Sequence, residues 1–189
     1  MIEIRLPADE ETIRRVSIGD EVLLSGRIVT ARDAVHKYIV ENKPAFLHDL
    51  LDRSIIYHCG PVVKKTSGGW EIISAGPTTS IRQEPYEAEV IRTYHPAGIM
   101  GKGGMGASSL QAMVDCGAAY FHAVGGLAAI LADRVCSVES VHMLEEFGSP
   151  EALWVLNVEK FPAVVTMDAG GNDLHQQVND RCRQRLHVR

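Results

Sequence analysis

Three short segments of the chain place basic side chains where a strand pattern gives way to a helix pattern. They are TARD with Arg32, GPTTSIR with Thr78 and Arg82, and GKGGMG with Lys102. A helix N-terminus offers unpaired backbone N–H groups and the positive end of the helix dipole, and both favour anions. Ligands of α/β sheets gather beyond the carboxyl ends of the strands, so we expect the three junctions to face one pocket.

A pocket lined by Arg32, Arg82 and Lys102 suits a small molecule that carries two carboxylates. An arginine makes a forked, two-point contact with a carboxylate, whereas a lysine supplies a single mobile charge. Thr78 would present a hydroxyl at the same place, and His36 follows Arg32 by one helical turn, so it could face the same pocket. Each of these side chains alone is more often a surface or structural residue, so the hypothesis depends on their convergence.

The glycines of GKGGMG leave a second interpretation open. Gly101, Gly103 and Gly106 match the G-x-G-x-x-G pattern of dinucleotide-binding loops, after an expected strand and before an expected helix. The acidic residue that this pattern needs about 20 residues further on has no good match, because Asp133 lies too far along the chain. A non-catalytic module that binds a dicarboxylate or a nucleotide is therefore an alternative to an enzyme.

The composition predicts one folded domain over residues 1–189. Hydrophobic residues make up 46% of the chain and charged residues 23%, and the formal net charge is −5. Nucleic-acid binders usually carry a basic excess instead. No apolar run of the sequence approaches the roughly 20 residues of a membrane span, and the N-terminus has no apolar signal segment. We therefore expect a cytoplasmic protein with no nucleic-acid or membrane partner.

The cysteines do not predict a metal site in this chain. Iron–sulfur and zinc sites normally have closely spaced ligands, whereas the four cysteines here are scattered and include no C-x-x-C pair. Scattered thiols are most often small buried side chains. The four are Cys59, Cys116, Cys136 and Cys182.

The expected elements mix strands and helices, which predicts the α/β class with a mixed sheet. Strands are expected at 21–31 (a strand pair, or one strand with a bulge at Ser25-Gly26), 55–59, 61–65, 70–76, 97–100, 120–124 and 128–131, and a strand pair within 153–168. The segment 55–76 is predicted to be antiparallel. Helices are expected near 31–42 (capped by Thr30 or Asp33), from Pro85 to Tyr94, at 108–118 and at 173–186.

The same segments, taken in order, resemble the class I fumarase family. The resemblance rests on GDEVLLSGRIVTARDAVHK, GPVVKK, SAGPTTSIRQEPYEAEVI, IMGKGGMG, HAVGG and EALWVLNVEKFPAVVTMDAGGNDL, and it runs from about residue 6 to residue 174. SAGPTTSIR and GKGGMG together are highly specific. Within the family, the chain is similar to the separately encoded β subunit of an iron–sulfur fumarate hydratase or L(+)-tartrate dehydratase. In one-chain relatives this region is the C-terminal domain.

This resemblance implies a three-layer swivelling β/β/α domain and a hydro-lyase that reversibly hydrates fumarate to (S)-malate. It assigns Thr78 as the catalytic base, and Arg32, Arg82 and Lys102 as the cations that bind the dicarboxylate substrate. The possible further pocket residues are His36, Thr79, Gly101, Gly103 and Gly104.

The resemblance also implies a partner. In this family three cysteines of the other subunit, or of the N-terminal domain, hold a [4Fe-4S] cluster, which agrees with the missing cysteine motif here. We therefore expect no metal on this chain alone, activity only with an iron–sulfur α subunit, and an α2β2 assembly. The β subunit of an L(+)-tartrate dehydratase is the alternative within the class, because residues that distinguish the two substrates can lie on the partner.

Overall fold

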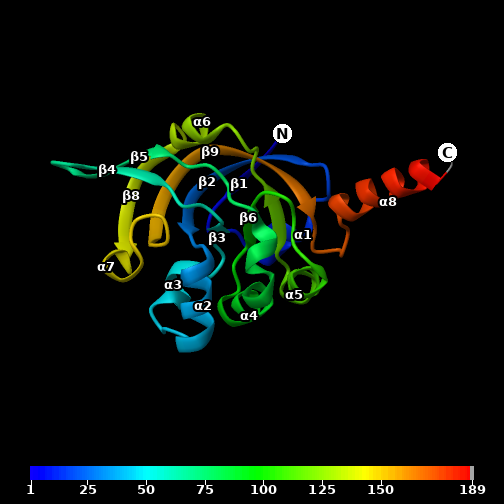
Figure 1. Cartoon of the computed structure of the whole chain (residues 1–189), viewed down its shortest axis with the longest axis horizontal. Helices are drawn as coiled ribbons and strands as arrows, with labels where there is room; N and C mark the ends of the chain where they lie inside the picture. The colour runs from blue at the N-terminus through cyan, green and yellow to red at the C-terminus, as the bar shows by residue number, and fades with distance from the viewer. Residues whose placement is uncertain (188–189) are drawn as a thin grey trace.

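A seven-stranded mixed sheet forms the centre of the computed structural model, which describes residues 1–187 (Figure 1). The sheet order is β1-β2-β3-β6-β7-β9-β8. Its strands are β1 (Ile2–Arg5), β2 (Glu21–Thr30), β3 (Ile55–Tyr57), β6 (Gly98–Gly101), β7 (Ala119–His122), β8 (Val135–His142) and β9 (Leu153–Met167). The predicted α/β class with a mixed sheet is confirmed.

The strand pairings close the middle of this sheet into a ring. β2 pairs in parallel with β3, β3 with β6, and β6 with β7, while β9 runs antiparallel to both β7 and β2. β1 and β8 lie outside the ring, paired with β2 and β9. Because β2, β3, β6 and β7 are parallel, their carboxyl ends meet at one edge, where ligands of α/β sheets gather.

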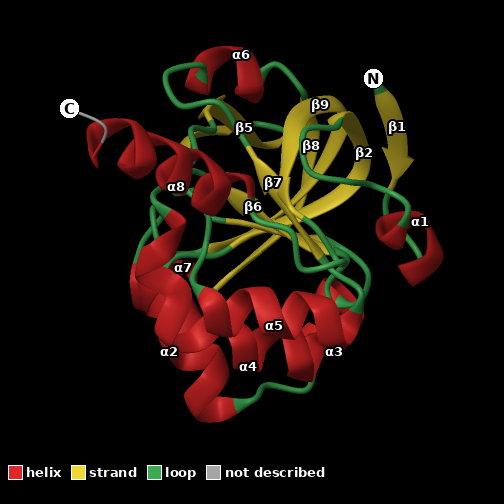
Figure 2. Cartoon of the chain, turned by 90° about the vertical axis from the view of Figure 1, so that its right-hand side faces the viewer, coloured by secondary structure: helices red, strands yellow, loops and turns green. Residues whose placement is uncertain are grey.

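Four helices cover one face of the sheet (Figure 2). They are α2 (Asp33–Asn42), α3 (Leu47–Leu51), α4 (Glu84–Tyr94) and α5 (Ala107–Cys116). Across the sheet from them lie the hairpin of β4 (Val62–Thr66) and β5 (Gly69–Ser74) and the short helix α6 (Ala128–Ala132) (Figure 1). The remaining helices are α1 (Glu10–Arg14), the 3-10 helix Ser80–Gln83, α7 (Leu144–Phe147) and α8 (Leu174–His187).

The ring separates two hydrophobic cores. Tyr57, Met100 and Phe161 belong to the core on the side away from the four helices, and all three are fully buried. Ile56 and Ile99, which directly precede Tyr57 and Met100 in the sequence, belong to the core that α2, α4 and α5 cover. Successive side chains of a strand point to opposite faces, so these strands are buried on both sides. The parallel strands are thus held firmly beneath the junctions that follow them.

Strand β3 corrects the prediction that the whole segment 55–76 is antiparallel. β4 and β5 form the expected antiparallel hairpin, but β3 runs parallel to both β2 and β6. Its three residues are all fully buried, as is typical of a parallel strand with both faces covered. The consequence for the site is direct, because His58 after β3 lies at the same sheet edge as Arg32 and Lys102.

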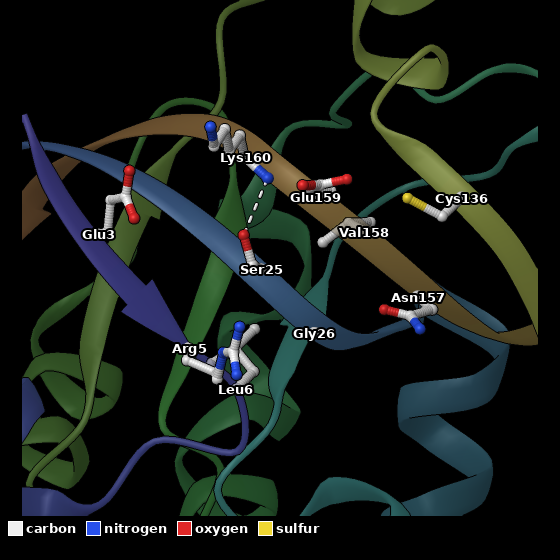
Figure 3. A pocket seen from close by; sticks show the side chains of 10 residues that line it. All are labelled: Glu3, Arg5, Leu6, Ser25, Gly26, Cys136, Asn157, Val158, Glu159 and Lys160. Atoms are coloured by element: carbon white, nitrogen blue, oxygen red, sulfur yellow. Dashed lines mark hydrogen bonds between the residues drawn. The ribbon is translucent and has the colours of Figure 1, made fainter.

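Two other predictions in the second half of the chain are wrong. Residues 128–131 form helix α6 rather than a strand, in keeping with the helix preference of the sequence AAILA. The expected strand pair within 153–168 is one strand, β9, and its neighbour β8 was not predicted. Lys160 has a positive φ of 51°, and its N–H donates to Ser25 Oγ at 2.9 Å (Figure 3). β9 therefore bends at Lys160. The bend lies opposite the predicted bulge of β2, where the register of the β2–β9 pairing shifts between Leu24 and Gly26.

Within residues 1–187, every helix is too short or too polar to cross a bilayer.

Candidate active site

Backbone hydrogen bonds bring the second and third junctions together at the end of β3. The N–H of Thr78 donates to the His58 carbonyl at 2.7 Å, and the N–H of Lys102 donates to the Thr78 carbonyl at 3.2 Å. The N–H of Ser80 donates back to the Lys102 carbonyl at 3.0 Å. Thr79 and Lys102 are bridge partners in these contacts. Segment 78–80 therefore lies beside the glycine loop as a short extension of the sheet.

The first junction reaches the second through an ion pair. Arg82 Nη2 lies 3.0 Å from Asp33 Oδ2, and Gln83 donates a hydrogen bond to the same carboxylate. Asp33 is the first residue of α2, and Arg32 immediately precedes it as the N-cap. The structure thus places the backbone segments that carry all four predicted residues next to one another at the carboxyl edge of the sheet.

Arg32 is held by groups from the loop before β9. Its Nε lies 3.3 Å from Glu151 Oε1, and its Nη1 donates to the Pro150 carbonyl at 3.3 Å. Glu151 also accepts the N–H of Ala34 at 3.0 Å, so it caps α2, and the predicted caps Thr30 and Asp33 are wrong. The Thr30 hydroxyl instead donates to the Ala152 carbonyl at 3.3 Å. The Arg32 side chain is 21% exposed, which leaves part of the guanidinium accessible.

Lys102 and Thr78 differ from the two arginines in their partners. Arg32 and Arg82 each have one carboxylate partner. Within residues 1–187 Lys102 makes no ion pair, so its charge is available to an anion. Thr78 is half-buried, and its hydroxyl donates to the His58 carbonyl at 3.1 Å. That bond directs the proton toward the protein. No carboxylate within the described residues hydrogen-bonds to this hydroxyl.

The glycine loop is closed to a phosphate by a carboxylate of the chain itself. Glu84 accepts hydrogen bonds from the N–H groups of Gly106, Ser108 and Ser109, at 2.7, 3.2 and 3.2 Å, and from the Ser109 hydroxyl at 2.6 Å. These are the free donors at the start of α5, where a dinucleotide would place its pyrophosphate. The internal carboxylate therefore argues against the nucleotide-binding alternative.

The predicted pocket glycines lie in close contact with neighbouring side chains or in turns. A Cβ on Gly101 would collide with Ser80 Oγ, and a Cβ on Gly104 would lie 2.5 Å from the His175 ring. Gly103 and Gly104 have positive φ values of 89° and 76°, which glycine adopts without strain. Gly103 also lines a cavity of about 430 Å³ together with His122 and His175.

A buried polar cluster lies beneath the junctions. Of its residues, only His36 was predicted from the sequence as a pocket residue. Glu87 Oε2 is 2.8 Å from His58 Nε2 and 3.2 Å from His36 Nε2. His58 Nδ1 is 2.9 Å from Ser80 Oγ, which is 2.7 Å from the Tyr120 hydroxyl. All five side chains are fully buried. His36 therefore lies under the predicted pocket rather than in its lining.

The sequence did contain a signal for this cluster. Glu87 shares the buried face of α4 with Val90, Ile91 and Tyr94. A carboxylate on the apolar face of an amphipathic helix needs a buried partner, because glutamate is almost never fully buried unless it is paired.

The electrostatics of the cluster follow from these contacts. Burial alone would raise the pKa of Glu87, but the charges and hydrogen bonds of His36 and His58 lower it to about 2. Burial lowers the pKa of His58. Burial would also lower the pKa of His36, but the Glu87 carboxylate outweighs it and raises that pKa. Glu87 is therefore an anion between two histidines of different charge.

Potential metal ligands in the described part of the chain meet only in this cluster. One ligand atom from each of His36, His58 and Glu87 lies within 4.8 Å of the other two. Glu87 forms a hydrogen bond of 2.8 Å with His58 and an ion pair of 3.2 Å with His36.

The cysteines do not fit an iron–sulfur cluster. Cys59 is buried, which raises the pKa of its thiol to about 12, and within residues 1–187 no cysteine joins a group of three potential metal ligands. The prediction that the scattered thiols are buried is correct only for Cys59. Cys116 is half-buried, and Cys136 on β8 and Cys182 on α8 are exposed.

A second cavity, of about 420 Å³, lies away from the junctions beside the bulge of β2 (Figure 3). Its lining includes Glu3 and Glu159 as well as Arg5 and Lys160. None of the predicted site residues lines it, and its balanced charges give no preference for a dianion.

Comparisons with known proteins give matches along most of the chain. A family model described as "Fumarase C-terminus" matches residues 1–178. A protein of Geobacillus stearothermophilus with the provisional name fumarate hydratase class I is 46% identical over 190 residues, which cover 98% of this chain but only 36% of that protein. The chain thus spans about a third of that relative.

Two β subunits match the chain over most of their own length. A provisionally named L(+)-tartrate dehydratase subunit beta of Methanocaldococcus jannaschii is 41% identical over 94% of this chain and 92% of its own. The L(+)-tartrate dehydratase subunit beta of Escherichia coli is 37% identical over 89% of this chain and 83% of its own.

Proposed function

The chain belongs to the fumarase C-terminal family, and from that premise we propose that it is the β subunit of a hydro-lyase. The proposed reaction is the reversible hydration of fumarate to (S)-malate. The observation that carries the proposal is the meeting of three cation-bearing junctions, at Arg32, Arg82 and Lys102, beside the Thr78 hydroxyl. In an acidic chain, such a concentration of positive charge suits a small dicarboxylate.

The cations contribute most where negative charge grows during the reaction. Removal of a proton next to a carboxylate spreads negative charge onto that carboxylate. Arg82, held by Asp33, and Lys102, unpaired within the described residues, stabilise that charge once the partner covers the site and excludes water. Arg32, fixed by Glu151 and the Pro150 carbonyl, orients the substrate with its exposed part.

Thr78 is the proposed base. Its hydrogen bond to the His58 carbonyl at 3.1 Å orients the hydroxyl, but a threonine hydroxyl is a poor base until its proton is removed. We assign this activation to a carboxylate of the partner subunit, since none of the described residues supplies one. The proton taken from the substrate carbon then rests on the Thr78 oxygen.

The proposed partner is an iron–sulfur α subunit, in an α2β2 assembly. The described cysteines of this chain do not fit a cluster, so a [4Fe-4S] cluster would be held by cysteines of the partner. Bound there, it supplies Lewis-acid chemistry for departure of the substrate hydroxyl. We further propose that residues 1–189 act as one three-layer swivelling β/β/α domain that closes against this partner.

Tartrate is the second candidate substrate, because both relatives that this chain covers almost completely are named tartrate dehydratase β subunits. Co-expression with an iron–sulfur α subunit of the family under anaerobic conditions, followed by fumarate and tartrate assays side by side, tests the proposal. We expect turnover of one substrate by the complex, and neither colour nor turnover from this chain alone. A brown or active isolated chain, or a complex inactive on both substrates, contradicts it.

A further inference from the structure

A chain of buried polar contacts, four hydrogen bonds and one ion pair, runs beneath the site and reaches all three junctions. It joins, in order, the Arg32 carbonyl, His36, Glu87, His58, Ser80 and Tyr120. Arg32 belongs to the first junction and Ser80 to the second. Tyr120 lies against the third, since a Cβ on Gly101 would be 3.2 Å from its hydroxyl. Because the side chains from His36 to Tyr120 are fully buried, the hydrogen bonds within this network must satisfy one another.

The two partners of His36 fix its charge. Nδ1 lies 2.9 Å from the Arg32 carbonyl oxygen, and Nε2 lies 3.2 Å from Glu87 Oε2. A carbonyl can only accept, so Nδ1 carries a proton, and an unprotonated Nε2 would bring its lone pair against the carboxylate, so both ring nitrogens of His36 must carry a proton. His36 is therefore an imidazolium whose charge is balanced by Glu87. The other titratable groups near the pair are His58 after β3, Asp33 on α2 and Tyr120 on β7.

The remaining proton positions follow from Glu87. His58 Nε2 must donate to the carboxylate at 2.8 Å, so a neutral His58 accepts at Nδ1 from the Ser80 hydroxyl at 2.9 Å. Ser80 Oγ then accepts from the Tyr120 hydroxyl at 2.7 Å. From His58 to Tyr120 every donor has one acceptor, which gives this part of the network a single arrangement.

We propose that His36, Glu87 and His58 are positioning residues that hold the three cation-bearing junctions in register, with His36 as a doubly protonated imidazolium. The proposal rests on the proposed function of the site. One end of the network fixes the backbone of Arg32. The other end fixes Ser80, two residues after Thr78, whose N–H donates to the Lys102 carbonyl, and Tyr120, which packs against Gly101 just before Lys102.

Nitrogen-15 NMR of the histidine-labelled full chain tests the charge assignment without any activity. We expect His36 to show protons on both ring nitrogens throughout neutral pH, and His58 to show one, on Nε2. A neutral His36 at neutral pH would overturn the proposal. Binding of one equivalent of zinc to the full chain at this cluster, abolished by Glu87→Gln, would also overturn it in favour of a metal site.

Kinetics of the assembled enzyme test the positioning role. Glu87→Gln removes the charge that balances His36 and should let the junctions shift. Misplacement of a reacting group by about 1 Å can lower the rate about 100-fold. We therefore expect a loss of that order in kcat/KM, with KM raised and kcat lowered. Glu89→Gln is the matched control, the same change on the exposed side of α4, and should leave both constants within about twofold. Equal constants for the two variants would overturn the role.

Ser80→Ala interrupts the network at its other end and replaces Glu87→Gln where that variant does not fold. We expect it to lower kcat/KM while thermal unfolding shows a folded chain; unchanged constants contradict the proposal. If the wild-type complex turns over neither substrate, the proposed function fails, and the NMR experiment still decides the network.

Discussion

The Arg82 guanidinium lies 3.0 Å from the carboxylate of Asp33, the residue that follows Arg32. This ion pair spans two segments that are far apart in the sequence and ties the 3-10 helix to the start of α2. Both side chains are nearly half exposed, so the pair contributes little to stability. Its importance is geometric, because it holds a partly accessible guanidinium at the opening where we place the substrate.

The first prediction concerns Thr78. Thr78→Ser keeps a hydroxyl that can donate to the His58 carbonyl, so the assembled enzyme should retain measurable turnover. Thr78→Ala removes the proposed base and should lower kcat by about 100-fold or more, the usual contribution of a positioned acid or base. Steady-state assays of the two variants decide the question. Equal activities would remove Thr78 from the role of base.

The second prediction concerns the close approach of the glycine loop to the buried network. Gly101→Ala would place a methyl group against the Ser80 hydroxyl and 3.2 Å from that of Tyr120, in a fully buried place. Such overpacking typically costs about 1–3 kcal/mol, so denaturant unfolding should show a loss of that size.

Gly68→Ala is the control for this change, because nothing lies within 4 Å of a Cβ at that position. It should leave the free energy of unfolding nearly unchanged. A Gly101→Ala variant as stable as Gly68→Ala would mean that the glycine loop does not pack on Ser80 as described.

The third prediction concerns pH. The pKa of Glu87 is about 2 in the folded chain and near 4.5 when unfolded. The stability that its charge contributes is therefore present above pH 4.5 and is lost as pH falls toward 2. The loss should be on the order of 3 kcal/mol.

This prediction is checked by measuring the free energy of unfolding across this pH range for the wild type and for Glu87→Gln. The variant lacks the titrating carboxyl, so its free energy of unfolding should fall less steeply with decreasing pH. Glu89→Gln should keep the wild-type slope. If Glu87→Gln and wild type lose stability in parallel, Glu87 is not the buried anion that the contacts indicate.

The three junctions were easier to recognise in the sequence than the sheet around them. The junctions at Arg32, Arg82 and Lys102 were recognisable because a strand pattern, a turn and a helix pattern meet there, and such signals are local. The parallel pairing of β3 and the length of β9 depend on contacts between distant segments, which periodicity does not contain.

The residues that hold the site were the harder part. Glu151 and Glu84 cap α2 and α5 from elsewhere in the chain, whereas cap prediction considers only neighbours in sequence. Glu87 was recognisable as a carboxylate on an apolar helix face, but its partner His58 follows a strand of another segment. Pairing of this kind becomes visible only when the fold brings the segments together.

The most direct test of the central claim is the loss of activity when each cation is removed from the assembled enzyme. Arg32→Ala, Arg82→Ala and Lys102→Ala should each lower kcat/KM by about 100-fold or more, since one contact that binds or stabilises the reacting dicarboxylate is worth roughly 3 kcal/mol. Arg92→Ala is the control, because Arg92 is as exposed as Arg82 and also pairs with one carboxylate, Asp115. It should retain nearly full activity. If the three variants retain activity comparable to Arg92→Ala, these cations do not bind the substrate and the account is wrong.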